Sequence, residues 1–270
     1  MPGASGAVDN LEGHLEKFVI LMAIGRVGSN LVVSYLTHSP KVHMVNEFTT
    51  AIRSQGKARG LPPEEISAEQ KDAFERYFAR QMDPVKDRLV SKPWQGAKLA
   101  VNSFVDPEWF ASEINRLGIR VIRMRRRNLV KAAVSQIRAR EFAEHSKQKY
   151  GQASWGVRKA KDILPPSHIE FAEISKLVDR SARQVAEFET FCASLTTPAL
   201  DIEYSELTRD IDGTVEKVFR FLGLDPVRRP PEFVKATSDD LSEALSNFDD
   251  LIAGFRGTAY EAMVMEGRKG

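Results

Sequence analysis

Four short apolar runs alternate with segments of helical spacing along most of this chain, and this alternation limits the folds that the chain can adopt. Apolar runs of strand length predict buried strands, whereas apolar residues repeated every three or four positions predict amphipathic helices. Strands that alternate with helices form a mainly parallel sheet flanked by helices on both faces. We therefore predict an α/β fold. The expected strands cover residues 18–24, 98–101, 119–124 and 199–202, and the expected helices cover residues 30–37, 106–117, 129–142 and 213–222.

Two long segments, about 49–95 and 141–197, interrupt this alternation. The first contains a charged helical pattern after the helix start Pro62-Pro63-Glu64-Glu65. The second contains a polar connector near 146–154 and a long amphipathic helix from about Ile169. We interpret both as helical insertions into one domain. Such insertions shape a substrate cleft, form the contact of a homodimer or pack on the core, and the sequence leaves these roles open.

Composition excludes several classes of protein. The single cysteine, Cys192, rules out an intrachain disulfide, and no His, Cys and Asp cluster has the spacing of metal ligands. The longest apolar run is far shorter than the ~20 residues of a membrane span. Acidic residues precede this run, unlike in a secretory signal peptide. We expect a cytoplasmic protein with a buried thiol, no metal, no membrane span and disordered tails at about 1–14 and 265–270.

The first predicted strand runs directly into the turn Gly25-Arg26-Val27-Gly28-Ser29-Asn30 and then into a helix. A helix N-terminus offers unpaired N–H groups and the positive end of the helix dipole, so it attracts anions. Glycines let the backbone approach a phosphate, Ser29 adds a hydroxyl donor, and the Arg26 guanidinium suits phosphate oxygens. No lysine follows Gly28, so this is not the Gly-x-x-x-x-Gly-Lys-Ser/Thr loop. The sequence predicts an anion site, with an ordinary turn as the alternative.

A second basic segment lies about a hundred residues later. Residues 117–140 include eight Lys and Arg side chains and no acidic side chain. Arg127 follows the third predicted strand, at the edge where α/β sheets place ligands, and Asn128 is a good N-cap for the next helix. Ser135 lies about two helical turns further on and can face the same anion as Arg127. We therefore predict a second anion site.

A solvated basic surface is the alternative for this segment, and it is our interpretation of Arg120, Arg138 and Arg140. Binding of single-stranded nucleic acid is less favoured, because the segment lacks the interleaved aromatic residues on which bases stack.

In their order and spacing, these two motifs resemble those of the sulfotransferases that use 3′-phosphoadenosine 5′-phosphosulfate (PAPS). Ile202-Glu-Tyr-Ser-Glu-Leu207 with Val218-Phe-Arg-Phe-Leu-Gly-Leu224 is similar to the strand, Tyr-x-x-Leu and Phe-Leu-Gly helix of that family. Ser246-Asn-Phe-Asp-Asp-Leu251 with Phe255-Arg-Gly-Thr-Ala-Tyr260 resembles the C-terminal segment of bacterial carbohydrate sulfotransferases, the nodulation-factor type especially. The resemblance implies one P-loop-like sulfotransferase domain over residues 1–270. It covers about residues 18–47, 96–140 and 198–263.

The resemblance also implies roles for single residues. Arg127 and Ser135 fall on the pair that holds the 3′-phosphate of PAPS. Tyr204 falls where relatives often contact the adenine, with a buried structural tyrosine as the alternative. Arg256 falls in a C-terminal loop that often closes over the nucleotide, with a surface arginine as the alternative. Asn30 replaces the second hydroxyl residue that is common in the first loop. The residues that fall on the 5′-phosphosulfate loop are Arg26, Val27, Gly28, Ser29 and Asn30.

Sulfuryl transfer to an alcohol needs in-line geometry, stabilisation of the leaving phosphate and a base for the acceptor proton. Arg26 is expected to stabilise the leaving group. Carbohydrate sulfotransferases that resemble this chain tend to carry a glutamate at the position of Glu47, which is therefore the expected base. His43 is the rival, since an imidazole is the base in cytosolic aryl sulfotransferases. Lys98 matches a lysine of the nodulation-type relatives and is expected to contact the donor sulfate or the acceptor, with a surface lysine as the alternative.

Together, the motifs and the resemblance predict an enzyme that transfers a sulfuryl group from PAPS to a hydroxyl of a small-molecule or glycan acceptor and releases adenosine 3′,5′-bisphosphate. A carbohydrate or glycolipid is the favoured acceptor, and no nucleic acid partner is expected. One alternative is a P-loop kinase-like phosphotransferase, which the missing loop lysine disfavours. The other is a nucleotide-binding or nucleic-acid-binding protein without catalysis.

Overall fold

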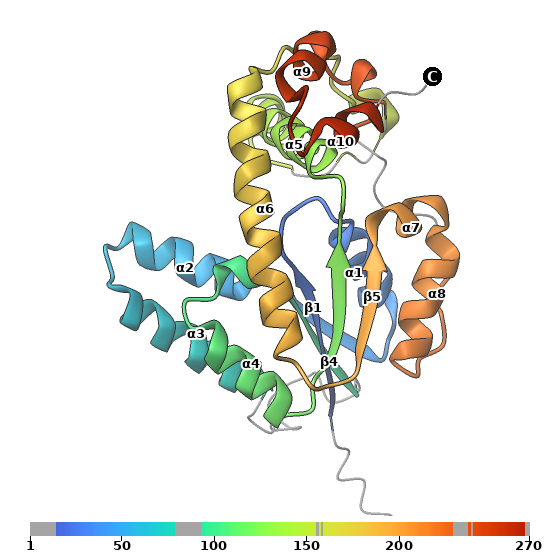
Figure 1. Cartoon of the computed structure of the whole chain (residues 1–270). Helices are drawn as coiled ribbons and strands as arrows, with labels where there is room; N and C mark the ends of the chain where they lie inside the picture. Colours follow the sequence, from blue (N-terminus) through green and yellow to red (C-terminus); the bar gives the residue numbers. More distant parts are fainter. Residues whose placement is uncertain are drawn as a thin grey trace, which may run out of the picture.

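The computed structural model describes residues 15–78, 93–154, 157, 159–228, 237–238 and 240–267. In this part of the chain, one sheet of parallel strands has the order β2-β3-β1-β4-β5, so β1 lies at its centre (Figure 1). The predicted α/β class with a parallel sheet is confirmed. The strands are β1 (Glu16–Met22), β2 (Val42–Asn46), β3 (Trp94–Ala100), β4 (Arg120–Arg125) and β5 (Ala199–Glu203).

Helices cover both faces of this sheet, as expected for strands joined by helical crossovers. Helices α1 and α8 lie on one side, with the short α7 at the end of β5 (Figure 1). The lower half of α6 covers the other side, together with the α2, α3 and α4 helices (Figure 1). The helices of these two layers are α1 (Ser29–His38), α2 (Phe48–Ala58), α3 (Pro63–Phe78), α4 (Pro107–Arg116), α6 (Phe171–Ala193), α7 (Tyr204–Arg209) and α8 (Ile211–Phe221).

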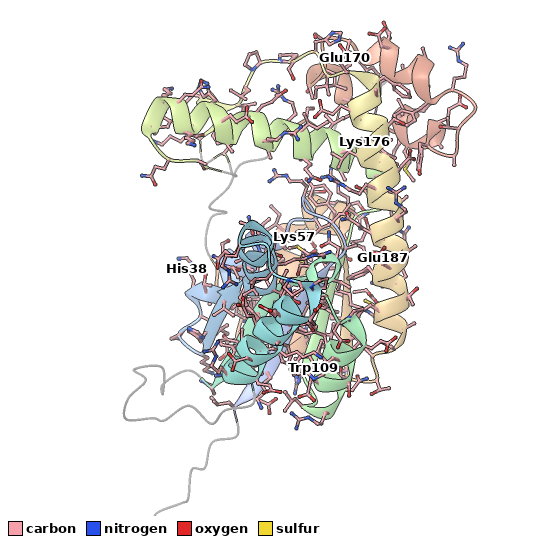
Figure 2. All side chains as sticks on the ribbon, turned by 90° about the vertical axis from the view of Figure 1, so that its left-hand side faces the viewer. His38, Lys57, Trp109, Glu170, Lys176 and Glu187 are labelled. Carbon is pink, nitrogen blue, oxygen red and sulfur yellow. The ribbon has the colours of Figure 1, made fainter. Side chains whose placement is uncertain are left out.

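A group of helices lies beyond the carboxyl ends of the strands. It consists of α5 (Leu129–Tyr150), α9 (Phe248–Phe255), α10 (Glu261–Met265) and the upper half of α6 (Figure 1). Figure 2 shows α5 running outward beside the Glu170 end of α6, whereas Glu187, further along α6, lies level with the body of the domain. Short 3-10 turns complete the chain at Val101–Ser103, Ala160–Asp162 and Leu241–Glu243.

The central strand explains why this sheet forms. From Phe18 onward β1 is buried on both faces, because its side chains meet helices above and below. Gly96 on β3 is the partner of Phe18, and a Cβ at Gly96 would lie 2.2 Å from the Phe18 ring. The glycine therefore leaves the space that the phenylalanine fills, and the two neighbouring strands pack through this pair.

The observed elements differ from the predicted ones mainly where apolar patterns are weak. Strand β2 was not predicted, because it lies at the sheet edge and is only partly buried. Helix α2 was not predicted either. Strand β3 begins at Trp94, ahead of the predicted start at Lys98, since Gln95 and Gly96 interrupt the apolar run. Helix α5 continues to Tyr150 through the expected polar connector and ends at Gly151 with φ +76°.

Several local predictions are confirmed. The Asp106 side chain caps α4 by accepting a hydrogen bond from the Trp109 N–H at 3.0 Å, and Asn128 caps α5 in the same way. Cys192 is buried. Arg138 corrects the prediction of a solvated basic surface, because it is buried and donates to the carbonyls of Leu164 and Pro165, anchoring the segment before α6.

Some predictions fall outside the described residues. These are residues 1–14 and 268–270 of the expected tails, and residues 79–92 within the first insertion. Residues 265–267, also expected in the C-terminal tail, complete α10 and its following turn, where the Gly267 carbonyl accepts from the Leu241 N–H at 2.7 Å. Within the described residues, no helix combines the length and apolar character needed to cross a bilayer.

Candidate active site

Most of the predicted site residues lie along one edge of the sheet. The carboxyl ends of parallel strands meet at the same edge, so residues that follow different strands are brought together there. Glu47 directly follows β2, Lys98 lies near the end of β3, and the loop 25–30 follows β1. Arg127 follows β4, and Tyr204 follows β5. A row of functional groups therefore crosses the whole sheet.

The loop after β1 has a backbone suited to an anion. Arg26 and Gly28 both have left-handed backbone angles, with φ +65° and +81°. A Cβ at Gly28 would lie 2.5 Å from Leu207 Cδ2, so this position requires glycine for space as well as for φ. In the described part of the chain, the hydrogen bonds of the loop and of the start of α1 leave the N–H groups of residues 27–30 without an acceptor. Such N–H groups bind anions.

The two predicted anion sites touch each other. Arg26 Nε donates to Ser135 Oγ at 3.2 Å, across 109 positions of sequence. Ser135 is buried in the second turn of α5, so its hydroxyl is fixed beside the loop. Burial lowers the pKa of the Arg26 guanidinium, and the nearby Tyr204 hydroxyl opposes this shift. A desolvated guanidinium that remains charged is stabilised by an anion beside it.

A third basic residue, which the sequence did not single out, supports the loop. Arg126 is 8% exposed, and its Nη1 donates to the carbonyl oxygen of Arg26 at 2.8 Å. Its guanidinium carbon lies 4.1 Å from the centre of the Tyr204 ring. In the sequence, Arg126 is one of eight basic residues between positions 117 and 140. The available signal was its place beside Arg127 at the end of a strand.

At the other end of the row, Lys98 joins β3 to β2 and to the start of α1. Its Nζ lies 2.7 Å from Glu47 Oε1 and donates to Asn30 Oδ1 at 2.5 Å. The Lys98 side chain is 5% exposed and the Glu47 side chain is 36% exposed. Lys98 is therefore not the surface lysine considered as an alternative. Its ammonium group lies between the carboxylate and the first turn of α1.

The rival base, His43, lies elsewhere. Strand register aligns His43 with Gln95 on β3, and Gln95 with Lys17 on β1. Lys17 is five residues before the end of β1, which corresponds to roughly 16 Å along a strand. The His43 Nδ1 lies 2.9 Å from the Tyr77 hydroxyl, which donates to the Gly96 carbonyl at 2.9 Å. The structure therefore separates His43 from the loop that carries Arg26.

Four predicted residues contribute less directly. The Val27 side chain is buried in the core, so Val27 can contact an anion only through its backbone. Ser29 Oγ lies 3.4 Å from the Met22 sulfur and is buried. The Arg127 side chain is 90% exposed and its Nε lies 3.6 Å from Glu203, so it is not in contact with Ser135. Arg256 is exposed at the end of α9.

Among the described residues, no three His, Cys, Asp or Glu side chains are grouped so that they could hold a metal ion. The row carries basic side chains, backbone N–H groups and the carboxylates of Glu47 and Glu203, each paired with a basic side chain. This set of groups suits a ligand with several negative charges.

No protein family model matches this sequence, and no curated protein matches it. The structure is similar to that of a sulfotransferase from Alicyclobacillus acidocaldarius, with 15% identity, a TM-score of 0.42 and coverage of 94% of this chain and 97% of the other. It is also similar to a mouse sulfotransferase complexed with PAP, with 12% identity, a TM-score of 0.44 and coverage of 94% and 90%. A sulfotransferase domain from the curacin biosynthetic pathway shows 10% identity, a TM-score of 0.39 and coverage of 93% and 83%. All three TM-scores are below 0.5, so the roles assigned below rest on contacts within this chain.

Proposed function

We propose that this chain is a sulfotransferase that moves the sulfuryl group of PAPS to a hydroxyl of an acceptor. The observation that carries this proposal is the contact between Arg26 and Ser135. It joins a phosphate loop after β1 to the second basic motif after β4. Two adjoining anion sites suit a nucleotide that is phosphorylated at two positions, and PAPS carries both a 3′-phosphate and a 5′-phosphosulfate.

The order of these groups along the carboxyl ends of the strands suggests how the ligand is oriented in the site. The 5′-phosphosulfate lies over the loop 26–30, near the middle of the row, with its sulfuryl end toward Lys98 and Glu47. The 3′-phosphate lies toward Ser135, on the β4 side. Arg127 completes this second site through rotation of its exposed side chain, which among the described residues is paired with Glu203.

The groups along the row supply what sulfuryl transfer needs. The bond between sulfur and the 5′-phosphate oxygen breaks, while a bond forms between sulfur and the acceptor oxygen. Arg26 and the loop N–H groups stabilise the charge that develops on the phosphate, which leaves in adenosine 3′,5′-bisphosphate. The acceptor proton passes to a base, for which Glu47 is our candidate.

Glu47 is favoured over His43 by geometry. Glu47 is partly exposed and contacts Lys98, which in turn contacts the first turn of α1. His43 is hydrogen-bonded to Tyr77, several residues before the strand ends. Lys98 is placed to bind the sulfuryl oxygens once the donor is present, because its ammonium group lies beside Asn30 at the end of the loop.

Calorimetry with adenosine 3′,5′-bisphosphate tests the nucleotide site. We expect tight binding, with weaker binding of adenosine 5′-phosphate, because the latter lacks the group for Ser135 and Arg127. Arg26→Ala and Arg127→Ala should both weaken binding, whereas Arg140→Ala, an exposed arginine paired with Glu173, is the matched control. Tighter binding of ATP than of the bisphosphate would support the phosphotransferase alternative.

Mass spectrometry of acceptor mixtures incubated with PAPS tests the transfer itself. We expect a mass gain of one sulfuryl group on a hydroxyl compound, with carbohydrates and glycolipids as the first classes to screen. Arg26→Ala and Glu47→Ala should abolish the gain. Binding to arbitrary nucleic acid with a steep salt dependence, and no transfer, would instead support a nucleic-acid-binding protein.

A further inference from the structure

We infer that Arg126 is a positioning residue that holds the loop in its anion-binding shape, acting on the 5′ end of the nucleotide through the backbone of Arg26. This inference rests on the proposed function, because it assigns Arg126 to one part of the same site.

Arg126 has an unusual environment for a charged residue. Arginine is rarely buried without polar partners, and Arg126, which is 8% exposed, has such a partner in the loop after β1. It follows β4 directly, and its Nη1 donates to the Arg26 carbonyl at 2.8 Å. Its guanidinium therefore reaches from the end of β4 to the loop after β1. The hydrogen bond fixes the Arg26 carbonyl group, which belongs to the predicted phosphate loop.

Because of peptide geometry, this contact also orients a neighbouring N–H group that can bind the ligand. The carbonyl of Arg26 and the N–H of Val27 belong to one planar trans peptide, so they point in opposite directions. When Arg126 holds the carbonyl on its own side, the Val27 N–H points away from Arg126. Arg26 and Gly28 have left-handed angles in the same loop, and residues of this kind form concave nests of N–H groups that bind anions.

The Tyr204 ring packs against both Arg126 and the loop that Arg126 holds. The Arg126 guanidinium carbon lies 4.1 Å from the centre of the Tyr204 ring. The same ring borders Gly28, since a Cβ at Gly28 would lie 3.5 Å from Tyr204 Cδ2. The ring thus contacts both the loop and the residue that holds the loop. A planar guanidinium can stack on a ring while it donates to a carbonyl, which a lysine ammonium cannot do equally well.

Calorimetry with three nucleotides separates this role from a general effect on folding. The probes are adenosine 3′,5′-bisphosphate, adenosine 5′-phosphate and adenosine 3′-phosphate, titrated into the full chain and into Arg126→Gln and Arg126→Lys. We expect affinity for the two ligands with a 5′-phosphate to fall by about 10- to 100-fold, the range for a lost hydrogen bond to a charged group. Affinity for adenosine 3′-phosphate should stay within about twofold of the unchanged chain, because its phosphate lies at Ser135.

Arg127→Gln is the matched control, because it changes the neighbouring arginine. It should weaken binding of the two ligands with a 3′-phosphate and leave adenosine 5′-phosphate unchanged. Tyr204→Leu removes the ring that supports Arg126 and also changes the expected adenine contact, so its loss should be larger for the two ligands with a 5′-phosphate than for adenosine 3′-phosphate. Arg126→Lys, which keeps the charge but not the planar fork, keeps the test decisive if Arg126→Gln does not fold.

Three results would overturn the inference. An equal loss for all three nucleotides would show a general structural role. A loss confined to the ligands with a 3′-phosphate would place Arg126 in the other anion site, and no loss in either Arg126 variant would leave it without a role in binding. If the unchanged chain binds none of the three nucleotides, the proposed function itself fails and the inference fails with it. If it binds the bisphosphate but the Arg126 variants behave otherwise than expected, only the inference fails.

Discussion

Lys98 and Glu47 form an ion pair at the edge of the sheet, with Nζ and Oε1 2.7 Å apart. The two partners differ in environment, because the lysine is buried and the carboxylate is partly open to solvent. The ammonium group is also bonded to Asn30 at the start of α1. The pair therefore connects the proposed base to the proposed donor loop through one buried cation.

Glu47→Gln separates the base role from the structural role of this pair. The amide oxygen can still accept from Lys98, so the free energy of unfolding should change by no more than about 1 kcal/mol. The amide cannot accept the acceptor proton, so turnover with PAPS should fall by about 100-fold or more. Affinity for adenosine 3′,5′-bisphosphate should be unchanged, since this product lacks the sulfuryl group.

Steady-state kinetics and calorimetry on the same preparation check these expectations for Glu47. Glu47→Ala is the contrasting variant, because it leaves the buried ammonium of Lys98 with Asn30 alone and should lower stability by about 1–3 kcal/mol. Full turnover in Glu47→Gln would remove Glu47 as the base.

Gly28→Ala tests the close approach between the loop and α7. The new Cβ would lie 2.5 Å from Leu207 Cδ2, and alanine also disfavours the φ of +81°. Gly118→Ala is the matched control, because Gly118 has φ +61° and no atom within 4 Å of the added Cβ. Chemical denaturation should show a loss of about 1 kcal/mol for Gly118→Ala and a larger loss for Gly28→Ala.

The double variant Gly28→Ala with Leu207→Ala shows whether packing is the cause. Removing the leucine side chain makes room for the new methyl group, so the combined loss should be smaller than the sum of the two single losses. Strictly additive losses would show that the loop moves freely away from α7.

The pKa of Cys192 gives a prediction about pH. Burial raises the pKa of this thiol from 9.0 to about 11, so the folded chain keeps its proton where the unfolded chain loses it. The stabilising contribution is complete below pH 9 and is lost as the pH rises through about 11. The native thiol should also react with a disulfide reagent at pH 8 far more slowly than the thiol of the urea-unfolded chain. Equal rates in the two states would contradict the buried position.

Of the strands in the described residues, the sequence predicted all except β2. Strand β1 is a continuous apolar run from Phe18 onward because both of its faces are covered, whereas β2 at the sheet edge has a mixed composition and was missed. Capping residues such as Asp106 could be read locally, since a cap depends only on its own turn. Arg138 was misjudged because its burial depends on a segment about 26 residues away.

In the candidate site too, some residues could be predicted from the sequence and others could not. The sequence pattern placed Arg26 directly after a predicted strand, where the parallel topology puts ligands. Glu47 and Lys98 were expected in the site only because of the resemblance to the sulfotransferases. The role of Arg126 depends on a contact with a carbonyl 100 residues earlier and with the Tyr204 ring, so no local pattern reveals it. The sequence could not separate Glu47 from His43 either, because that separation is a matter of strand register.

Gln70 on α3 links part of the first insertion to the candidate base. Its amide nitrogen donates to the carbonyls of Thr49 and Ser103 at 2.8 and 2.9 Å, and its amide oxygen accepts from the Val105 N–H at 3.1 Å. The contacts with Thr49 and Ser103 are buried and the contact with Val105 is partly buried. Thr49 is in the first turn of α2, two residues after Glu47. Gln70 therefore holds the turn from which the proposed base projects.

Gln70→Leu should consequently affect both stability and turnover. It removes three hydrogen bonds to backbone groups, two of them buried, which we expect to cost about 2–5 kcal/mol in the free energy of unfolding. Among molecules that remain folded, turnover should fall more than affinity for adenosine 3′,5′-bisphosphate, because α2 lies at the base end of the row. Glu69→Gln, next to Gln70 but on the exposed face, should change stability by less than about 0.5 kcal/mol. If Gln70→Leu lowered nucleotide affinity and turnover by the same factor, the amide would support the fold as a whole rather than the position of Glu47.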